Sequence, residues 1–152
     1  MFFLISLLQF KPNYKIMEGN NFITEKASRY KFDETVELLR SGAEKAGWSV
    51  PAIHDLQLSL AKAGKHIRPV KVIEICKPAY SGQMLELNHE RIISVMMPCR
   101  ISVYEKEDGK IYIALLNAAT MAPGLPANIA KVMKDAADDT FNLVLAVAEE
   151  SI

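Results

Sequence analysis

The sequence lacks an excess of charge of either sign. Eighteen lysines and arginines balance eighteen aspartates and glutamates, so the formal net charge is zero. The basic residues form no run or stripe along the chain. Because proteins that bind nucleic acid or an anionic membrane surface rely on clustered positive charge, the composition argues against nucleic acid as a partner.

Cysteine is equally scarce, with Cys76 and Cys99 as the only two. Two cysteines are too few for the disulfide scaffold of a small secreted domain. A chain of 152 residues, half of them hydrophobic, can bury a core without cross-links. These features favour a reducing compartment, and we expect a cytoplasmic protein with one domain.

The signatures of several enzyme classes are also missing. The sequence contains no G-x-S-x-G, no phosphate-binding glycine loop and no G-x-G-x-x-G after a predicted strand. It has no C-x-x-C or H-x-x-x-H pair, and its histidines stand singly at His54, His66 and His89. The absence of these motifs argues against catalysis, and the sequence indicates no particular cofactor or metal.

Residues 1–20 open with the apolar run MFFLISLLQF, followed by KPNYK. The run is shorter than the about 20 apolar residues of a membrane-spanning helix. A secretory signal would have positive charge before the run and small residues at a cleavage point, and both are missing. Translation could also start at Met17. We expect an extension outside the domain, either genuine or spurious, with an export signal as the weaker alternative, and one domain over residues 21–152 without a membrane segment.

From residue 21 onward, hydrophobic periodicity predicts alternating strands and helices. The predicted strands cover residues 21–32, 48–56, 68–76, 93–105 and 110–117. The predicted helices cover residues 33–48, 55–67, 78–87 and 126–150. The last helix carries an apolar stripe that includes Ile129, Val132 and Val144.

Local signals predict how these elements begin and end. Asp33 and Asp55 are expected as helix N-caps, and Gly47 as a helix stop. Pro51 places its strand at a sheet edge, since proline offers no donor to a neighbouring strand. Asp108-Gly109 predicts a hairpin turn with positive φ at both residues.

The order β-α-β-α-β-α-β-β-α, without an internal repeat or linker, predicts an α+β fold. We expect a single mixed or antiparallel sheet with helices mainly on one face. The other face would then lack a cover from its own chain. A two-fold homodimer is the commonest way to cover such a face.

Four stretches, in this order, resemble the bacterial and archaeal family called domain of unknown function 302 (DUF302). They are KFDETVELLRSGAEKAGWSV, IHDLQLSLAKAGK, RPVKVIEICKPAY and MMPCRISVYEKEDGKIYIALLN, and the long closing helix follows them. The resemblance runs from about Phe22 to the C-terminus. It implies a compact α+β domain that forms a homodimer, and it implies no established activity and no catalytic residues.

The stretch MMPCRISVYE places a cysteine and an arginine at the start of a predicted strand. Alternation puts Cys99 on one face with Ile101 and Val103, and Arg100 on the other. Free cysteine in an apolar row is most often buried. We therefore interpret Cys99 as a core residue, because a reactive thiolate would need a nearby cation and access to solvent.

Arg100 requires a partner or water on its own face of the sheet. Glu74 is the candidate, either within one subunit or across a dimer contact. We interpret Arg100 and Glu74 as a structural ion pair, with anion binding by Arg100 as the alternative.

Cys76 and His54 are two further candidates. Strand alternation puts Cys76 on the face of Val72 and Glu74. Cys76 and Cys99 both fall at strand ends and could approach each other, which makes a redox pair or a metal site conceivable. His54 beside Asp55 could form an acid–base unit. The simpler interpretation makes Asp55 the helix cap and His54 the end of the strand.

Two functions follow from these patterns. The leading hypothesis is a homodimeric module without catalysis of its own that binds a small molecule or a protein. Its candidate binding residues are Arg100, Glu74, Cys76, Cys99 and His54. The alternative hypothesis is a thiol-dependent redox protein, or a metal-binding or haem-binding protein, that uses Cys76 and Cys99.

Overall fold

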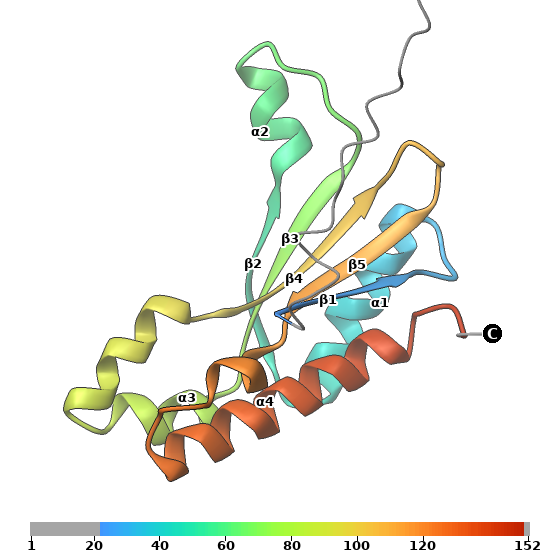
Figure 1. Ribbon diagram of the computed structural model, residues 1–152. Helices are drawn as coiled ribbons and strands as arrows, with labels where there is room; N and C mark the ends of the chain where they lie inside the picture. The colour runs from blue at the N-terminus through green and yellow to red at the C-terminus, as the bar shows by residue number, and fades with distance from the viewer. Residues whose placement is uncertain (1–21, 151–152) are drawn as a thin grey trace, which may run out of the picture.

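The computed structural model describes residues 22–150 (Figure 1). The strands are β1 (Ile23–Ala27), β2 (Ser49–Asp55), β3 (Val70–Cys76), β4 (Cys99–Glu105) and β5 (Ile111–Leu116). The α-helices are α1 (Phe32–Lys45), α2 (Leu56–Lys62), α3 (Pro78–Leu85) and α4 (Ala127–Leu145), and the 3₁₀ helices are η1 (His89–Met96) and η2 (Ala118–Met121). The predicted order of strands and α-helices is confirmed. The predicted extension over residues 1–20 lies outside the described part of the chain.

The five strands form one sheet in the order β1-β5-β4-β3-β2, and every neighbouring pair is antiparallel. The α+β prediction is confirmed, in its antiparallel form. β2 lies at the edge, as Pro51 requires, and its register with β3 shifts between Ser49 and Ala52. β4 lies at the centre and begins next to the cis Met97–Pro98 peptide bond.

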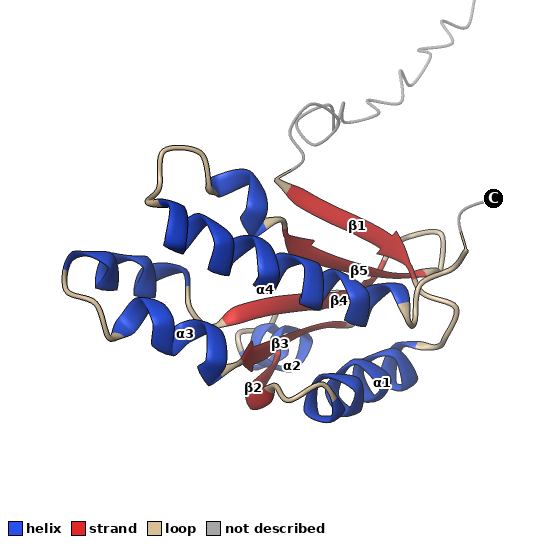
Figure 2. Cartoon of the chain, turned by 90° about the horizontal axis from the view of Figure 1, so that it is seen from below, coloured by secondary structure: helices blue, strands red, loops and turns tan. Residues whose placement is uncertain are grey.

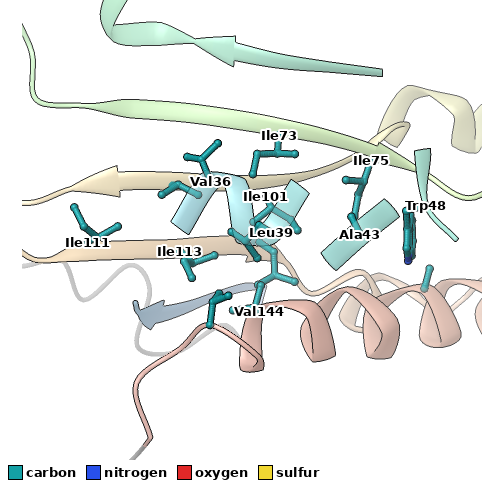
Figure 3. Packing of buried hydrophobic residues seen from close by; sticks show 14 residues of the cluster. Val36, Leu39, Ala43, Trp48, Ile73, Ile75, Ile101, Ile111, Ile113 and Val144 are labelled. Carbon is teal, nitrogen blue, oxygen red and sulfur yellow. The ribbon is translucent and has the colours of Figure 1, made fainter. Parts of the chain in front are cut away.

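The hydrophobic core lies between one face of the sheet and the helices α1 and α4 (Figure 2). The inward rows of β3, β4 and β5 meet Leu39 of α1 and Val144 of α4 (Figure 3). The fully buried strand residues are Ile73, Ile75, Ile101, Val103 and Ile113. Each contributes about 1.5–3 kcal/mol by leaving water. The apolar stripe predicted for the closing helix is buried, with Val144 in this core and Ile129 and Val132 in a second cluster together with Met84 and Met133.

The two faces of the sheet are covered unequally. The exposed face carries the outward rows of the strands, including Glu74, Arg100 and Leu116, and we call it the open sheet face. α2 extends beyond the end of the sheet and contains no buried residue (Figure 1). Leu58 of α2 is 55% exposed. Within residues 22–150, no helix is long and apolar enough to cross a membrane.

Several local predictions need correction. Lys31, and not Asp33, occupies the N-cap of α1; Asp33 lies in the first turn and pairs with Lys71 at 3.2 Å. A carboxylate there favours the helix through its dipole without capping it. Asp55 does cap α2, since its Oδ1 accepts a hydrogen bond from the Leu58 backbone N–H at 2.8 Å.

The segments around β4 differ from the prediction as well. Of Asp108 and Gly109, only Gly109 has positive φ, so the loop is not the two-residue turn that was predicted. The Lys106 backbone N–H donates to the Lys110 carbonyl, which leaves three residues in the loop and glycine at its left-handed position. Residues 93–96 belong to η1 rather than to a strand, because the chain there packs against α3.

Candidate functional site

Three of the predicted site residues meet on the open sheet face. Glu74 and Arg100 are direct partners in the β3–β4 register, with Arg100 Nε 3.6 Å from Glu74 Oε1. His54 approaches from β2, with Nε2 3.0 Å from the same oxygen. The Glu74 side chain is only 17% exposed, whereas those of Arg100 and His54 are 55% and 49% exposed. A largely buried carboxylate therefore lies between a guanidinium and an imidazole that are each about half exposed.

A second polar group lies on the same face near β1 and β5. Tyr104 donates a hydrogen bond to Glu25, and Lys106 Nζ lies 2.8 Å from the Glu25 carboxylate. Lys106 also lies 3.9 Å from the centre of the Tyr112 ring, which stacks on Tyr104. Burial and the neighbouring Glu25 carboxylate raise the pKa of Tyr104. The polar atoms of these residues are hydrogen-bond or ion-pair partners of one another, and they make this end of the open sheet face polar.

The two cysteines lie on the helix-covered side, in the wall of an apolar cavity of about 80 Å³. The cavity lies where the ends of β3 and β4 meet α3, η1 and α4. Its sulfur-containing wall residues are Cys76, Met84, Met96, Met97, Cys99 and Met133. In the described part of the chain only one other residue contains sulfur, Met121, and it packs in the adjoining cluster. We call this space the sulfur-lined cavity.

Cys76 differs from its predicted position. Strand alternation grouped it with Glu74, but its Sγ lies 3.6 Å from the hydroxyl of Ser81 in α3, and it shares the cavity with Cys99. The reason is that β3 ends at Cys76, where the chain turns into α3 at Pro78. Cys99 faces the helix side, as predicted. Burial raises the pKa of its thiol, and the nearby Cys76 adds to that shift.

Two of the residues that line the cavity, Lys77 and Tyr80, bind Asp139 of α4, which does not itself line the cavity. Lys77 Nζ lies 3.1 Å from Asp139 Oδ2 of α4, and the Tyr80 hydroxyl donates to the same oxygen at 2.6 Å. The hydrogen bond from Tyr80 and the contact with Lys77 lower the pKa of Asp139, although partial burial opposes them. The same hydrogen bond raises the pKa of Tyr80 to about 12. We call Lys77, Tyr80 and Asp139 the polar rim.

Trp48 forms the wall beside the polar rim. Trp48 lies in the connection between α1 and β2, its ring is 5.8 Å from the Tyr80 ring, and Lys77 Nζ is 5.7 Å from the indole centre. Trp48 is only 4% exposed. Of the buried side-chain nitrogens and oxygens in residues 22–150, Trp48 Nε1 is the one without a hydrogen-bond partner.

The family model of the domain of unknown function DUF302 matches residues 24–149. This chain belongs to the DUF302 family. The resemblance seen in the sequence is thereby confirmed, and the match includes both groups on the open sheet face, the sulfur-lined cavity and its polar rim.

The fold of this DUF302 domain is similar to a solved structure, the crystal structure of an uncharacterized conserved DUF302 protein from Bacillus stearothermophilus. The TM-score is 0.75 at 17% sequence identity, over 83% of this chain and 98% of that chain. Similarity at this level of identity establishes the fold alone. None of the curated proteins matches the chain.

The five predicted site residues of the DUF302 domain thus fall into two places on opposite sides of the sheet. Sequence reasoning missed Trp48 and the polar rim. Lys77 and Tyr80 lie close in sequence to Pro78, which begins α3. Asp139, in contrast, is one of several polar residues on the polar side of the closing helix. No sequence signal joins Asp139 to residues about 60 positions earlier in the chain. Among the described residues, no group of three or more His, Cys, Asp or Glu side chains is placed to hold a metal ion.

Proposed function

We propose that this DUF302 domain is a small-molecule binding module that holds its ligand in the sulfur-lined cavity. The observation that carries the proposal is the cavity itself: an apolar space of about 80 Å³ walled by flexible methionines. Small-molecule sites are concave and mostly apolar with few polar groups. Methionine side chains adapt their shape to a ligand.

The electrostatics of the cavity support binding rather than catalysis. Burial raises the pKa of Cys99, so its thiol stays protonated at neutral pH and is a weak nucleophile. Lys77 is engaged by Asp139, and Tyr80 donates to the same carboxylate. The polar rim therefore fixes the wall in place and leaves no activated base beside the cavity.

Cyclopentane, a compact apolar probe, tests this proposal. In ¹H–¹⁵N NMR spectra, adding it should shift the amide signals of cavity residues such as Met84, Cys99 and Met133. Ala136→Leu should abolish these shifts, because Ala136 lines the cavity and a leucine there fills it. Ala127→Leu adds the same side chain at an exposed position of the same helix and should leave the shifts intact. Shifts that are absent, or scattered over the surface, would refute the proposal.

A second candidate function is binding of monovalent copper in the same cavity. It is supported by the gathering of both free thiols with four thioethers, since soft thiolate and thioether ligands select Cu(I). Binding would release the thiol protons and would need no third His, Cys, Asp or Glu ligand. A cavity of about 80 Å³ suits a bare ion better than a haem. The free thiols also support the proposed cytoplasmic location.

Competition with the Cu(I) chelator bicinchoninate tests this second candidate. Cys76→Ser and Cys99→Ser should each weaken Cu(I) binding strongly, whereas Met121→Leu, which changes a sulfur outside the cavity, should not. Equal Cu(I) affinity of the wild type and both cysteine variants would rule out the site.

We also propose that a second copy of the domain covers the open sheet face. Exposed apolar residues at its edge, Ile23 and Leu116, support this proposal, as does the unburied helix α2. Light scattering should give a dimer at micromolar concentration. Leu116→Asp should dissociate it, while Ile92→Asp, on exposed η1, should not. A monomeric wild type at that concentration would contradict the proposal.

A further inference from the structure

The two cysteines of this DUF302 domain lie on neighbouring, hydrogen-bonded strands. Ile75 and Cys99 are direct partners in the β3–β4 register, and Cys76 is the next residue of β3. Neighbouring strands lie about 4.8 Å apart and rise about 3.3 Å per residue, so the Cα atoms of Cys76 and Cys99 are about 6 Å apart. Disulfide-bonded cysteines have Cα separations of about 4.4–6.8 Å. The backbone therefore places the pair within reach of a disulfide bond.

The positions of the two side chains agree with this reach. Regular alternation would point Cys76 to the open sheet face, away from Cys99. Cys76 is the last residue of β3, however, and its Sγ lies 3.6 Å from the Ser81 hydroxyl of α3. Both cysteines line the sulfur-lined cavity, and both are free and only partly buried. The two thiols therefore border the same space.

The surroundings of the two thiols set an order of reaction. Cys99 packs against the hydrophobic core, and burial together with the nearby Cys76 raises the pKa of its thiol. The thiolate is the attacking species in thiol–disulfide exchange, so Cys99 is a weak first nucleophile. Cys76 lies at the end of its strand, where the Ser81 hydroxyl is placed to donate a hydrogen bond to its sulfur. The first attack therefore falls to Cys76 and the second to Cys99.

We propose that Cys76 and Cys99 form a reactive dithiol, which small disulfides of the form R–S–S–R oxidise to an intramolecular disulfide. The Cys76 thiol gives its proton to water, its sulfur attacks one sulfur of the small disulfide, and one R–S⁻ leaves. The Cys99 thiol then loses its proton and attacks Cys76 Sγ, which releases the second R–S⁻. Two electrons pass from the protein to the small disulfide, and two protons convert both R–S⁻ groups to R–SH.

This reaction goes beyond the proposed ligand binding and does not depend on it. The reaction needs both thiols, whereas the proposed binding of an apolar molecule needs only the apolar walls of the cavity. Disulfides in a reducing compartment are usually transient and serve catalysis or redox sensing. Oxidation consumes both thiols, so it should also abolish any binding of Cu(I) at this site.

The disulfide of 2-mercaptoethanol, a small uncharged oxidant, tests the proposal. The reaction is stopped with acid, the remaining thiols are alkylated in urea, and the mass of the intact chain is measured. The folded wild type should lose both thiols and keep no mercaptoethanol adduct. Cys99→Ser should stop at one adduct on Cys76. Cys76→Ser should react at least about 10-fold more slowly than Cys99→Ser, because the thiol of Cys99 is buried.

The chain unfolded in urea is the matched control, since the sequence contains no cysteine besides these two. In urea the two single-cysteine variants should react at similar rates. The equilibrium constant for the intramolecular disulfide, measured against mercaptoethanol, should be at least about 10-fold smaller in urea than in the folded protein. If a serine variant does not fold, peptide mapping of the wild type at early times replaces it, and any adduct should then be on Cys76.

Three results would overturn the proposal. A folded wild type that keeps both thiols, or that stops at mercaptoethanol adducts, would refute the dithiol. An equilibrium constant that is no larger in the folded protein than in urea would show that the fold does not favour the disulfide. Adducts that form on Cys99 before Cys76 would refute the order of attack. Failure of cyclopentane to bind the reduced protein would contradict the proposed function and leave the dithiol standing.

Discussion

Replacing Arg100 and His54 together should destabilise the domain by more than the sum of the two single replacements. The Arg100 guanidinium and the His54 imidazole both approach one oxygen of Glu74, at 3.6 and 3.0 Å. Either alone leaves the carboxylate with a partner. Because Glu74 is only 17% exposed, removal of both leaves a poorly hydrated charge.

The exposed fractions of the side chains determine the expected losses of stability. Arg100 and His54 are about half exposed, so Arg100→Ala and His54→Ala should each reduce the free energy of unfolding by about 0.2–1 kcal/mol. The double variant adds the cost of an unpaired, largely buried acceptor, about 1–3 kcal/mol. Its total loss should therefore exceed the sum of the single losses by at least about 1 kcal/mol.

Urea unfolding at pH 7 measures these losses through a shift of the midpoint at constant slope. Lys134→Ala is the matched control, since Lys134 and Asp138 form an exposed ion pair on α4, and its effect should simply add to that of Arg100→Ala. If the loss of stability in the double variant lies within about 0.3–0.5 kcal/mol of the sum of the two single losses, water hydrates the Glu74 carboxylate adequately. That result would refute the reasoning.

Three further predictions concern the cavity and the core. With Cys76 replaced by serine, Cys99 should react slowly with Ellman's reagent at pH 8 and quickly in urea, because burial raises its pKa; equal rates would contradict its burial. The pKa of Tyr80, raised to about 12, means that its hydrogen bond to Asp139 stabilises the fold below about pH 10 and is lost as the pH rises towards 12. Tyr80→Phe should flatten that part of the stability profile, and an unchanged profile would argue against the bond. Ile101→Ala, at a 1% exposed position of the central strand, should lower the free energy of unfolding by about 2–5 kcal/mol. Urea unfolding measures this loss, and a smaller loss would contradict the prediction.

Much of the fold could be predicted because its signals are local. Alternation along β4 put Cys99, Ile101 and Val103 on the core side and Arg100 on the other, and the register then placed Arg100 opposite Glu74. The prediction failed where the chain changes direction. Cys76 lies at the last residue of a strand, where the turn into α3 overrides the alternation, and Asp108 lies in a loop whose length depends on the strand register.

The sequence by itself determined the order of elements, the antiparallel or mixed sheet and the faces of its strands, because periods of two and 3.6 residues are properties of neighbouring positions. Only the tertiary structure decided that six sulfur-containing side chains surround one cavity, that Asp139 binds Lys77 and Tyr80, and that the Trp48 N–H has no partner. These features arise where α3, η1 and α4 meet the ends of β3 and β4. They depend on how segments far apart in the chain pack together, and no local pattern specifies that packing.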